Sequence, residues 1–455
     1  MPRAWTRTFG FLDAASLDPG RRTGVHWFGG RVLARCGSGL SEADSSTMTS
    51  SRSAEADAVP AKPRARAGKK AVLQGAWGLH AADALLVALF LGLTFLLGVF
   101  PMGDTDFWWH LRTGDLIRQT GEVPHVDPYL YGGPPEKPWI DLHWGFEVLL
   151  SLGYEWGGMV AVNLAKCVIT TVAVFLLITA RKRDWPLWVM ILTWLPAVLL
   201  LSGRMYVRPE TLTLLYMAIF LAVLFRIERW PWLAMILPVV QVLWVNSQGL
   251  FVLGPVVLGF ALIDSACHKG AFRPERARWW GIMLSATLLT GLACLINPYG
   301  IRGALFPLAL AGTMGNKVFE SIGELRPILT FIRETGSFQN LSLQLHFALL
   351  GLGALSFLIP GLWQLGVWAE SRRNPKLSAE PSGKGRKKRQ SKAKKGEEPP
   401  VWRLSVFRLL LALAFSFLSF KATRNSHQFA TVMGTVSAWN FGEWAAAIRA
   451  RRQAR

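Results

Sequence analysis

Residues 82–100 read ADALLVALFLGLTFLLGVF, and residues 101–110 continue with PMGDTDFWWH. The first segment is apolar over roughly the 20 residues that an α-helix needs to cross the hydrocarbon core of a membrane. The second segment places two carboxylates, Asp104 and Asp106, where that helix would end. Carboxylates beside lipid are costly, so they either cap a helix while hydrated or serve an ion, a proton or a substrate. On an extended segment residues i and i+2 project to one side, which would let both carboxylates act on one atom.

Apolar runs of similar length recur along the chain. Of its 455 residues, 51% are hydrophobic and only 17% are charged. This composition predicts an all-α fold, a polytopic transmembrane helical protein with about ten spans, because only helices and closed barrels satisfy their backbone hydrogen bonds in lipid. The predicted spans are residues 82–101, 159–180, 186–202, 211–225, 232–246, 249–265, 280–296, 342–365, 404–420 and 428–445.

Basic residues lie mostly in tails and connecting segments. The net charge of +21 would suit a nucleic-acid-binding protein. Nucleic acid is nevertheless rejected as a partner, because the charges fall between apolar runs, as the positive-inside rule expects when the partner is the lipid bilayer. Residues 1–75 lack periodicity, which predicts a disordered basic N-terminal segment, with Met48 as an alternative start. Residues 372–403 are interpreted as a disordered, basic cytoplasmic insert and residues 446–455 as a basic tail.

The alternation of basic segments orients the predicted spans. If residues 64–70 lie in the cytoplasm, every later major basic cluster falls on the same side. Both termini are therefore expected in the cytoplasm, and a long loop that opens at Asp104 is expected on the outer side. Residues 142–157 are apolar but interrupted by His143 and Glu147, which predicts a juxtamembrane helix at the interface within this loop.

The same orientation brings polar motifs of five loops to the outer face. Their carboxylates, arginines, amides and phenol belong to Asp104, Asp106, Arg204, Arg208, Asn246, Gln248, Asn297, Tyr299, Arg424 and Asn425. Binding groups concentrate in loops on a rigid scaffold, so a converging outer site is the better explanation. Alternatives remain for each motif. The arginines either clamp a phosphate or carboxylate or snorkel to lipid headgroups, and the amides either bind or form turns.

Other polar residues near these motifs are candidates for the same site. His143 and Glu147 are four residues apart, so on a helix they share a face and either pair with each other or hold a metal. Lys166 lies within a predicted span, where its expected partner is a lipid phosphate or an aspartate of the long loop. His110, after the aromatic pair, is assigned to substrate binding. A divalent metal ion on Asp104, Asp106 and Glu147 is the cofactor that these residues predict.

With these motifs the chain resembles the C-type (GT-C) membrane glycosyltransferases, and more closely bacterial relatives of the mannosyltransferases and oligosaccharyltransferases. The resemblance covers residues 77–445 and rests on one initial span, the long loop opening with Asp104-Thr-Asp106-Phe-Trp-Trp-His110, a juxtamembrane helix near 138–147 and helical hairpins. It implies a multi-pass protein of the bacterial inner membrane. It also implies transfer of a sugar from a polyprenyl-phosphate donor to a glycan, lipid or protein acceptor on the outer face. Asp104 and Asp106 would then supply the base or hold a divalent cation.

The residues fit this chemistry without the resemblance, since glycosyl transfer needs a base for the incoming hydroxyl and stabilisation of a departing phosphate. Other classes remain open. A transporter or flippase would place ionisable residues near the bilayer midplane in paired halves, yet Lys166 is the one clear candidate within a span and no repeated half is visible. A polysaccharide polymerase or ligase would share the outer site but use different loops. A structural or assembly protein would have no chemistry there.

Overall fold

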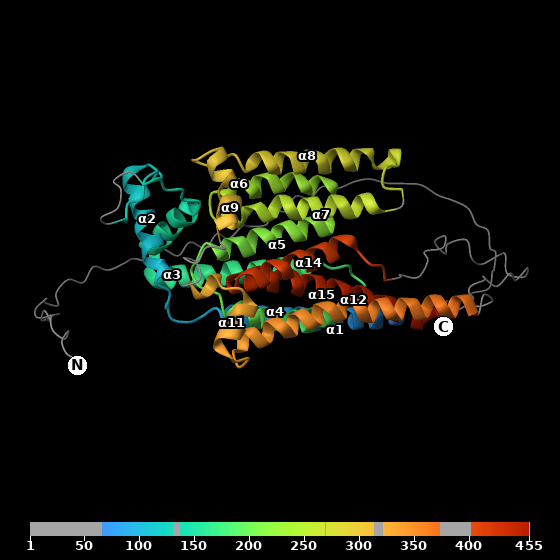
Figure 1. Cartoon of the computed structure of the whole chain (residues 1–455). Coiled ribbons are helices and arrows are strands. Elements are labelled where there is room, and N and C mark those ends of the chain that lie inside the picture. The colour runs from blue at the N-terminus through green and yellow to red at the C-terminus, as the bar shows by residue number, and fades with distance from the viewer. Residues whose placement is uncertain (1–65, 131–136, 269, 314–321, 374–401, 455) are drawn as a thin grey trace, which may run out of the picture. The chain divides into compact units, whose positions relative to one another are not determined.

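The computed structural model describes residues 66–130, 137–268, 270–313, 322–373 and 402–454. Within these ranges the chain is all-helical, and the β-structure is confined to one isolated bridge between Val126 and Pro138 (Figure 1). The α-helices are α1 Arg66–Leu97, α2 Asp106–Thr120, α3 Trp144–Thr179, α4 Leu187–Ser202, α5 Glu210–Arg226, α6 Leu237–Val245, α7 Leu253–Cys267, α8 Ala277–Ala293, α9 Ile301–Thr313, α11 Ile328–Thr335, α12 Leu341–Arg373, α14 Val406–Lys421 and α15 Ser426–Ala454. Short 3-10 turns join several of them, among them η1 Pro231–Ile236, η2 Gly249–Val252, η3 Pro274–Arg276, η4 Gly323–Leu325 and η5 Thr423–Asn425.

Three helices are long and apolar enough to cross a membrane. They are the helices Trp144–Thr179, Gly249–Cys267 and Leu341–Arg373. Shorter apolar helices cover Ala81–Leu97, Leu187–Ser202, Pro231–Val245 and Ile301–Gly312. By length and composition, the described part of the chain therefore has the helices of a membrane protein, and the predicted all-α class is confirmed.

Each predicted apolar range falls on a helix, but further segments outside those ranges are helical as well, among them α2, α9 and α11. Helix α1 begins at Arg66, inside the segment 1–75 for which disorder was predicted, and residues 1–65 lie outside the described part. Helix α12 continues to Arg373, and residues 374–401 of the predicted insert likewise lie outside it. Helix α15 continues to Ala454 through most of the predicted tail. Arg, Lys and Ala are among the best helix formers, which explains why basic segments extend the apolar helices.

Helix α3 consists of two segments separated by a pair of glycines. Gly157 and Gly158 have non-helical backbone angles, and the φ of 59° at Gly158 lies in the left-handed region that favours glycine. The segment before the break packs against α2, and the apolar segment 159–179 after it packs against α5 and α1. The predicted boundary between a juxtamembrane helix and a span thus coincides with a real interruption of the helix.

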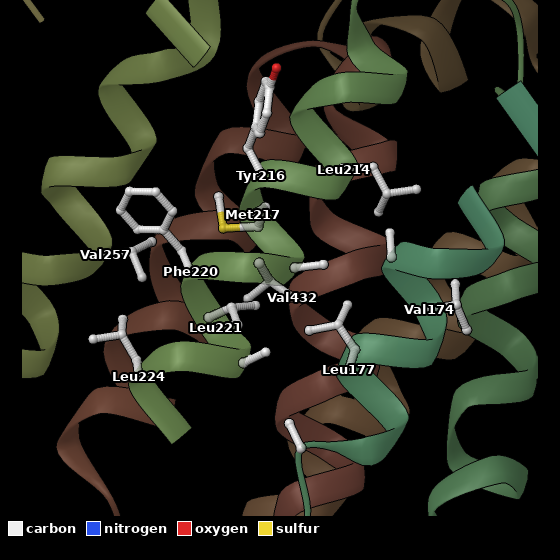
Figure 2. Packing of buried hydrophobic residues seen from close by; sticks show 14 of the residues in the cluster. Val174, Leu177, Leu214, Tyr216, Met217, Phe220, Leu221, Leu224, Val257 and Val432 are labelled. Carbon is white, nitrogen blue, oxygen red and sulfur yellow. The ribbon is translucent and has the colours of Figure 1, made fainter. Parts of the chain in front are cut away.

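The centre of the described core is formed by α5, α3, α7 and α15. Figure 2 shows Phe220 and Leu221 of α5 near Val257 of α7 and Val432 of α15, and Leu177 of α3 completes the contact from the other side. Helix α5 is apolar around its whole circumference, as expected for a helix with protein on all sides.

Helix α15 is buried although its sequence is rich in small and hydroxyl-bearing residues. Small residues let helix backbones approach closely in a membrane bundle. At Gly434, an added Cβ would lie 2.7 Å from the Cβ of Ala197 in α4, so only glycine fits. Thr431 and Thr435 satisfy their hydroxyls on carbonyls of the preceding turn, at 2.9 and 2.7 Å. Protein rather than lipid surrounds α15, which is why its sequence is less apolar than those of its neighbours.

Candidate functional site

Arg208, in the short connection between α4 and α5, holds both aspartates of the motif after α1. Its Nε and Nη2 donate to the two carboxylate oxygens of Asp104 at 2.5 and 2.7 Å, and Nη2 lies 3.1 Å from Oδ2 of Asp106. The hydrogen bonds to Asp104 raise the pKa of Arg208 above its usual value. Asp104 also accepts the N–H of Asp106 at 3.2 Å, so it helps to cap α2 as well as forming an ion pair.

The two aspartates differ in their access to solvent. The side chain of Asp104 is 3% exposed and that of Asp106 is 47% exposed. A buried carboxylate with a bidentate guanidinium partner has little capacity to accept a proton from a ligand. Asp106 is therefore the better placed of the two to act as a base.

Glu324 of η4 bridges two arginines from the α4–α5 connection. Its carboxylate oxygens accept from Nη1 of Arg208 at 3.1 and 3.3 Å and from Nη2 of Arg204 at 3.1 Å. The Thr423 hydroxyl donates to the Glu324 carbonyl at 3.0 Å, and the Thr423 amide donates to the Arg326 carbonyl at 3.1 Å. These bonds hold the turn that carries Glu324 against η5.

Glu210, in the first turn of α5, continues the same set of ion pairs. It lies 3.5 Å from Nη2 of Arg204 and accepts from Nη2 of Arg424 at 3.0 Å. Burial opposes ionisation of Glu210, but Arg424 and Arg204 together outweigh it, and the pKa of this carboxyl lies below its usual value. The helix N-terminus also favours a negative charge at this position.

These ion pairs form one connected set, which we call the arginine–carboxylate chain. It comprises Asp106, Asp104, Arg208, Glu324, Arg204, Glu210 and Arg424. With four carboxylates and three guanidiniums it carries one net negative charge. The prediction for the three arginines is that they bind phosphate or lipid headgroups. In the structure they contact carboxylates of the same polypeptide. Neither Glu210 nor Glu324 was among the predicted site residues.

A second polar cluster lies between α2 and the first segment of α3. His110 Nδ1 and Glu147 Oε1 are 2.7 Å apart, and both side chains are buried. Burial lowers the pKa of His110 to about 2 and raises that of Glu147 to about 11. Burial thus favours the neutral form of both groups. Pairing of Glu147 with His143, one of the two alternatives for these residues, is not seen: His143 is the N-cap of α3, and its Nδ1 lies 3.7 Å from Asp141.

The three carboxylates predicted to hold a metal ion do not form one group among the described residues. Asp104 and Asp106 contact Arg208, whereas Glu147 contacts His110, so these carboxylates face different partners. Across the described residues, no group of three or more His, Cys, Asp and Glu side chains is arranged to hold a metal ion.

A largely apolar cavity of about 310 Å³ adjoins the arginine–carboxylate chain. Arg424 belongs to both, and His143, Gln248 and Asn425 are the other predicted site residues in its lining. The apolar part of the lining includes Leu142, Leu250, Val252, Leu253, Phe306, Leu308 and Leu418. The cavity thus offers an apolar surface with a guanidinium at one side.

The predicted amides form turns and caps. Asn246 donates to the carbonyls of Val242 and Ile296 at 2.8 Å and accepts the indole N–H of Trp144 at 2.9 Å. Asn297 accepts the amide of Tyr299 within its own turn at 2.9 Å. Gln248 caps the turn that follows it by accepting the amide of Leu250, and Asn425 donates to the Leu418 carbonyl at 2.8 Å. Asn297 and Gln248 thus make local turn bonds, whereas Asn246 also joins its turn to segments 50 and 102 residues away.

Tyr299 joins two distant segments of the long loop region. Its hydroxyl donates to the Pro124 carbonyl at 2.8 Å and accepts the Asp141 amide at 3.0 Å. Burial raises the pKa of this phenol to about 12, so it stays protonated. Tyr299 thereby contacts both ends of the connection between α2, which carries His110, and α3, which carries Glu147.

Lys166, in the second segment of α3, does not pair with an aspartate of the long loop among the described residues. It is buried, and its Nζ has no hydrogen-bond partner among the described residues. The ammonium lies 4.1 Å from the ring centre of Phe100, within reach of a cation–π contact. Lys166 also lines a small, mostly apolar cavity of about 110 Å³ that contains Leu150 and Val207.

Comparison of the chain with models of protein families, with curated proteins and with solved structures found no match in any of the three. The resemblance to the GT-C glycosyltransferases therefore stays a prediction from the residues. The function proposed below rests on the geometry of the site.

Proposed function

We propose that this chain is a membrane glycosyltransferase that moves a sugar from a polyprenyl-phosphate donor to an acceptor on the extracytoplasmic face. One observation carries the proposal: Arg424 belongs both to the arginine–carboxylate chain and to the lining of the apolar cavity. A polyprenyl phosphate has the matching chemistry, an apolar chain joined to an anionic head. In this proposal the prenyl chain enters the cavity and the phosphate approaches Arg424 and its neighbours.

The proposed reaction assigns separate roles to the two ends of the arginine–carboxylate chain. The acceptor hydroxyl oxygen attacks the anomeric carbon of the donor, and the bond from that carbon to the phosphate oxygen breaks. The proton of the acceptor hydroxyl passes to the exposed carboxylate of Asp106. The electron pair leaves with the phosphate, and the guanidiniums of Arg204 and Arg424 stabilise its charge.

Glu324 contacts guanidinium groups that the proposed donor phosphate would also need. Its carboxylate contacts Arg204 and Arg208, and at 39% exposure its side chain is more accessible to solvent than either of these arginines. The donor phosphodiester carries one negative charge, as the carboxylate does, and its phosphate gains a second as the bond to the sugar breaks, so it competes with Glu324 for the arginines. We infer that Glu324 keeps the arginines neutralised until the donor arrives.

The proposal includes the ten-span topology, with both termini in the cytoplasm and the arginine–carboxylate chain outside. Cysteine labelling in a variant without the native cysteines tests it. An impermeant reagent applied from outside should modify a cysteine placed at residue 310 but not one at residue 385. The opposite labelling pattern would contradict the shared outer face on which the proposal depends.

Asp106→Asn tests the reaction. Purified protein in liposomes is given polyprenyl-phosphate hexoses labelled in the sugar, and transfer to added acceptors is followed with hydrolysis as the background. Loss of the base should lower the transfer rate by about 10²- to 10⁴-fold while donor binding is kept. Asp184→Asn, at an exposed aspartate outside the arginine–carboxylate chain, is the matched control. Full transfer by Asp106→Asn would refute the assignment.

A further inference from the structure

A groove of about 350 Å³ lies between the first turns of α4 and the last turns of α15 (Figure 1 shows both helices). Its apolar wall is formed by Trp188, Val189, Leu192, Phe441, Trp444 and Ile448. Arg449 and Arg452 complete the lining where α15 ends. The groove is separate from the residues assigned to glycosyl transfer, none of which line it.

The two arginines of this groove are available for an external anion. In the described part of the chain, neither Arg449 nor Arg452 forms an ion pair with a carboxylate. Two neighbouring charged residues of α15 already have partners of their own. Glu443 lies 2.6 Å from Arg408, and Arg451 lies 2.6 Å from Glu370. The positive charge at the groove is therefore not neutralised by these carboxylates.

Two further kinds of hydrogen-bond donor, one indole N–H and the first backbone N–H groups of α4, favour an anion near the two arginines. The indole N–H of Trp444, which lines the groove, is buried and has no hydrogen-bond partner among the described residues. Helix α4 starts after Pro186, which provides no side-chain cap, so the first backbone N–H groups of the helix have no partner from a capping side chain. Such a helix end attracts negative charge. Asp184, just before it, is exposed and does not line the groove.

The rest of the groove suits a hydrocarbon chain. Trp188 and Leu192, one turn apart on α4, are 59% and 62% exposed. In a helix bundle with membrane-spanning segments, large apolar side chains this exposed face lipid. The groove thus combines a cationic head site with an apolar wall that continues away from it along α4.

We propose that this groove binds one anionic phospholipid, with the phosphate at Arg449, Arg452 and the Trp444 indole and one acyl chain along Trp188 and Leu192. Basic residues near a membrane surface attract anionic lipids, and Trp prefers the same interfacial depth. The proposal needs only that the helices lie in a membrane, and it does not depend on glycosyl transfer. An occupant of this kind would join the ends of α4 and α15.

Native mass spectrometry of the full chain tests the proposal. The protein is titrated with phosphatidylglycerol and, separately, with phosphatidylcholine of identical acyl chains. The wild type should retain one phosphatidylglycerol more tightly than phosphatidylcholine. The double variant Arg449→Gln/Arg452→Gln should lose about 30-fold in affinity for phosphatidylglycerol, because each basic residue near the surface contributes about five-fold. Trp444→Phe, which keeps the ring and removes the N–H, should weaken retention by a smaller factor.

Arg451→Gln is the matched control for the single variants Arg449→Gln and Arg452→Gln, because each removes one positive charge, but Arg451 pairs with Glu370 and does not line the groove. Unchanged retention in this control, with loss in the double variant, supports the groove. Equal loss in Arg451→Gln and in the single variants Arg449→Gln and Arg452→Gln would mean that only the net charge matters, and the proposal would fail. Equal retention of both lipids, or displacement of the lipid by glycerol phosphate at comparable concentration, would also overturn it, because the site would then not select an anionic lipid.

Discussion

The most direct test of the arginine–carboxylate chain is Glu324→Gln. Glutamine keeps the length of the side chain but removes the negative charge that contacts Arg204 and Arg208. If Glu324 occupies guanidinium positions needed by the donor phosphate, the variant should bind a prenyl phosphate more tightly than the wild type. A purely structural ion pair predicts the opposite, a less stable protein with no gain in binding.

The expected gain follows from the exposure and geometry of this carboxylate. Glu324 makes three contacts of 3.1–3.3 Å with the two arginines, but its side chain is 39% exposed, so solvent screens the pairs. Exposed ion pairs contribute up to about 1 kcal/mol. Removing a competitor of about this strength should tighten binding by about five-fold. The gain should shrink in about 1 M salt, where the screening length falls to about 3 Å.

The assay is calorimetric or thermophoretic titration of detergent-solubilised protein with farnesyl phosphate, a short and soluble prenyl phosphate. Glu334→Gln is the matched control, because Glu334 is an exposed glutamate that pairs with Arg326 outside the arginine–carboxylate chain. Glu334→Gln should leave the dissociation constant unchanged. If Glu324→Gln binds farnesyl phosphate no better than the wild type, the idea that Glu324 competes with the phosphate is refuted.

Three further predictions concern the buried polar residues and one helix contact. Burial keeps Glu147 protonated in the folded state, while its unfolded form ionises above about pH 4.5, so the wild type should lose stability as the pH rises from 5 to 9. Glu147→Gln lacks this loss, and its melting temperature relative to the wild type should therefore increase with pH. A decrease would indicate a charged His110–Glu147 pair. Lys166→Met removes a buried amine without a described hydrogen-bond partner and should raise the stability by about 1–2 kcal/mol in thermal unfolding, whereas a marked loss would reveal a stabilising partner such as a lipid. Gly114→Ala would place a Cβ 2.0 Å from the Glu147 carbonyl oxygen and should destabilise the protein by about 1–3 kcal/mol, while Gly92→Ala, with nothing within 4 Å, should not.

Much of the fold could be predicted because helix formation in lipid depends on local composition. The apolar run before Asp104 and the run of α5 each identify a helix without any tertiary information. Helix α15 is also recognisable, although its Thr, Ser and Gly content reflects contact with protein rather than lipid. The helix start at Arg66 could not be located in the same way, since basic and small residues suit either a helix or an irregular segment.

The candidate site was only partly predictable, for a different reason. Charge alternation placed Asp104, Arg208 and Arg424 on one side of the membrane, and the structure brings them into one set of ion pairs. Which carboxylate neutralises which arginine depends on contacts between residues more than 100 positions apart, as for Arg208 and Glu324. Glu324 stands in a loop without a motif, so no local signal could have identified it. The short spacing of Arg208 and Glu210 around Pro209 was visible, yet it did not reveal that Glu210 pairs with the more distant Arg424.

The exposure of the four carboxylates separates structural from exchangeable members of the arginine–carboxylate chain. The side chains of Asp104 and Glu210 are 3% and 6% exposed, whereas those of Glu324 and Asp106 are 39% and 47% exposed. Breaking a buried pair by removing one partner costs about 3–5 kcal/mol, while an exposed pair contributes at most about 1 kcal/mol. A ligand of ordinary affinity can therefore displace Glu324 or engage Asp106, but it cannot separate Asp104 from Arg208. This difference assigns Asp104 and Glu210 to holding the arginines in position. It leaves Asp106 and Glu324 as the two carboxylates that can change partners if the proposed donor and acceptor bind.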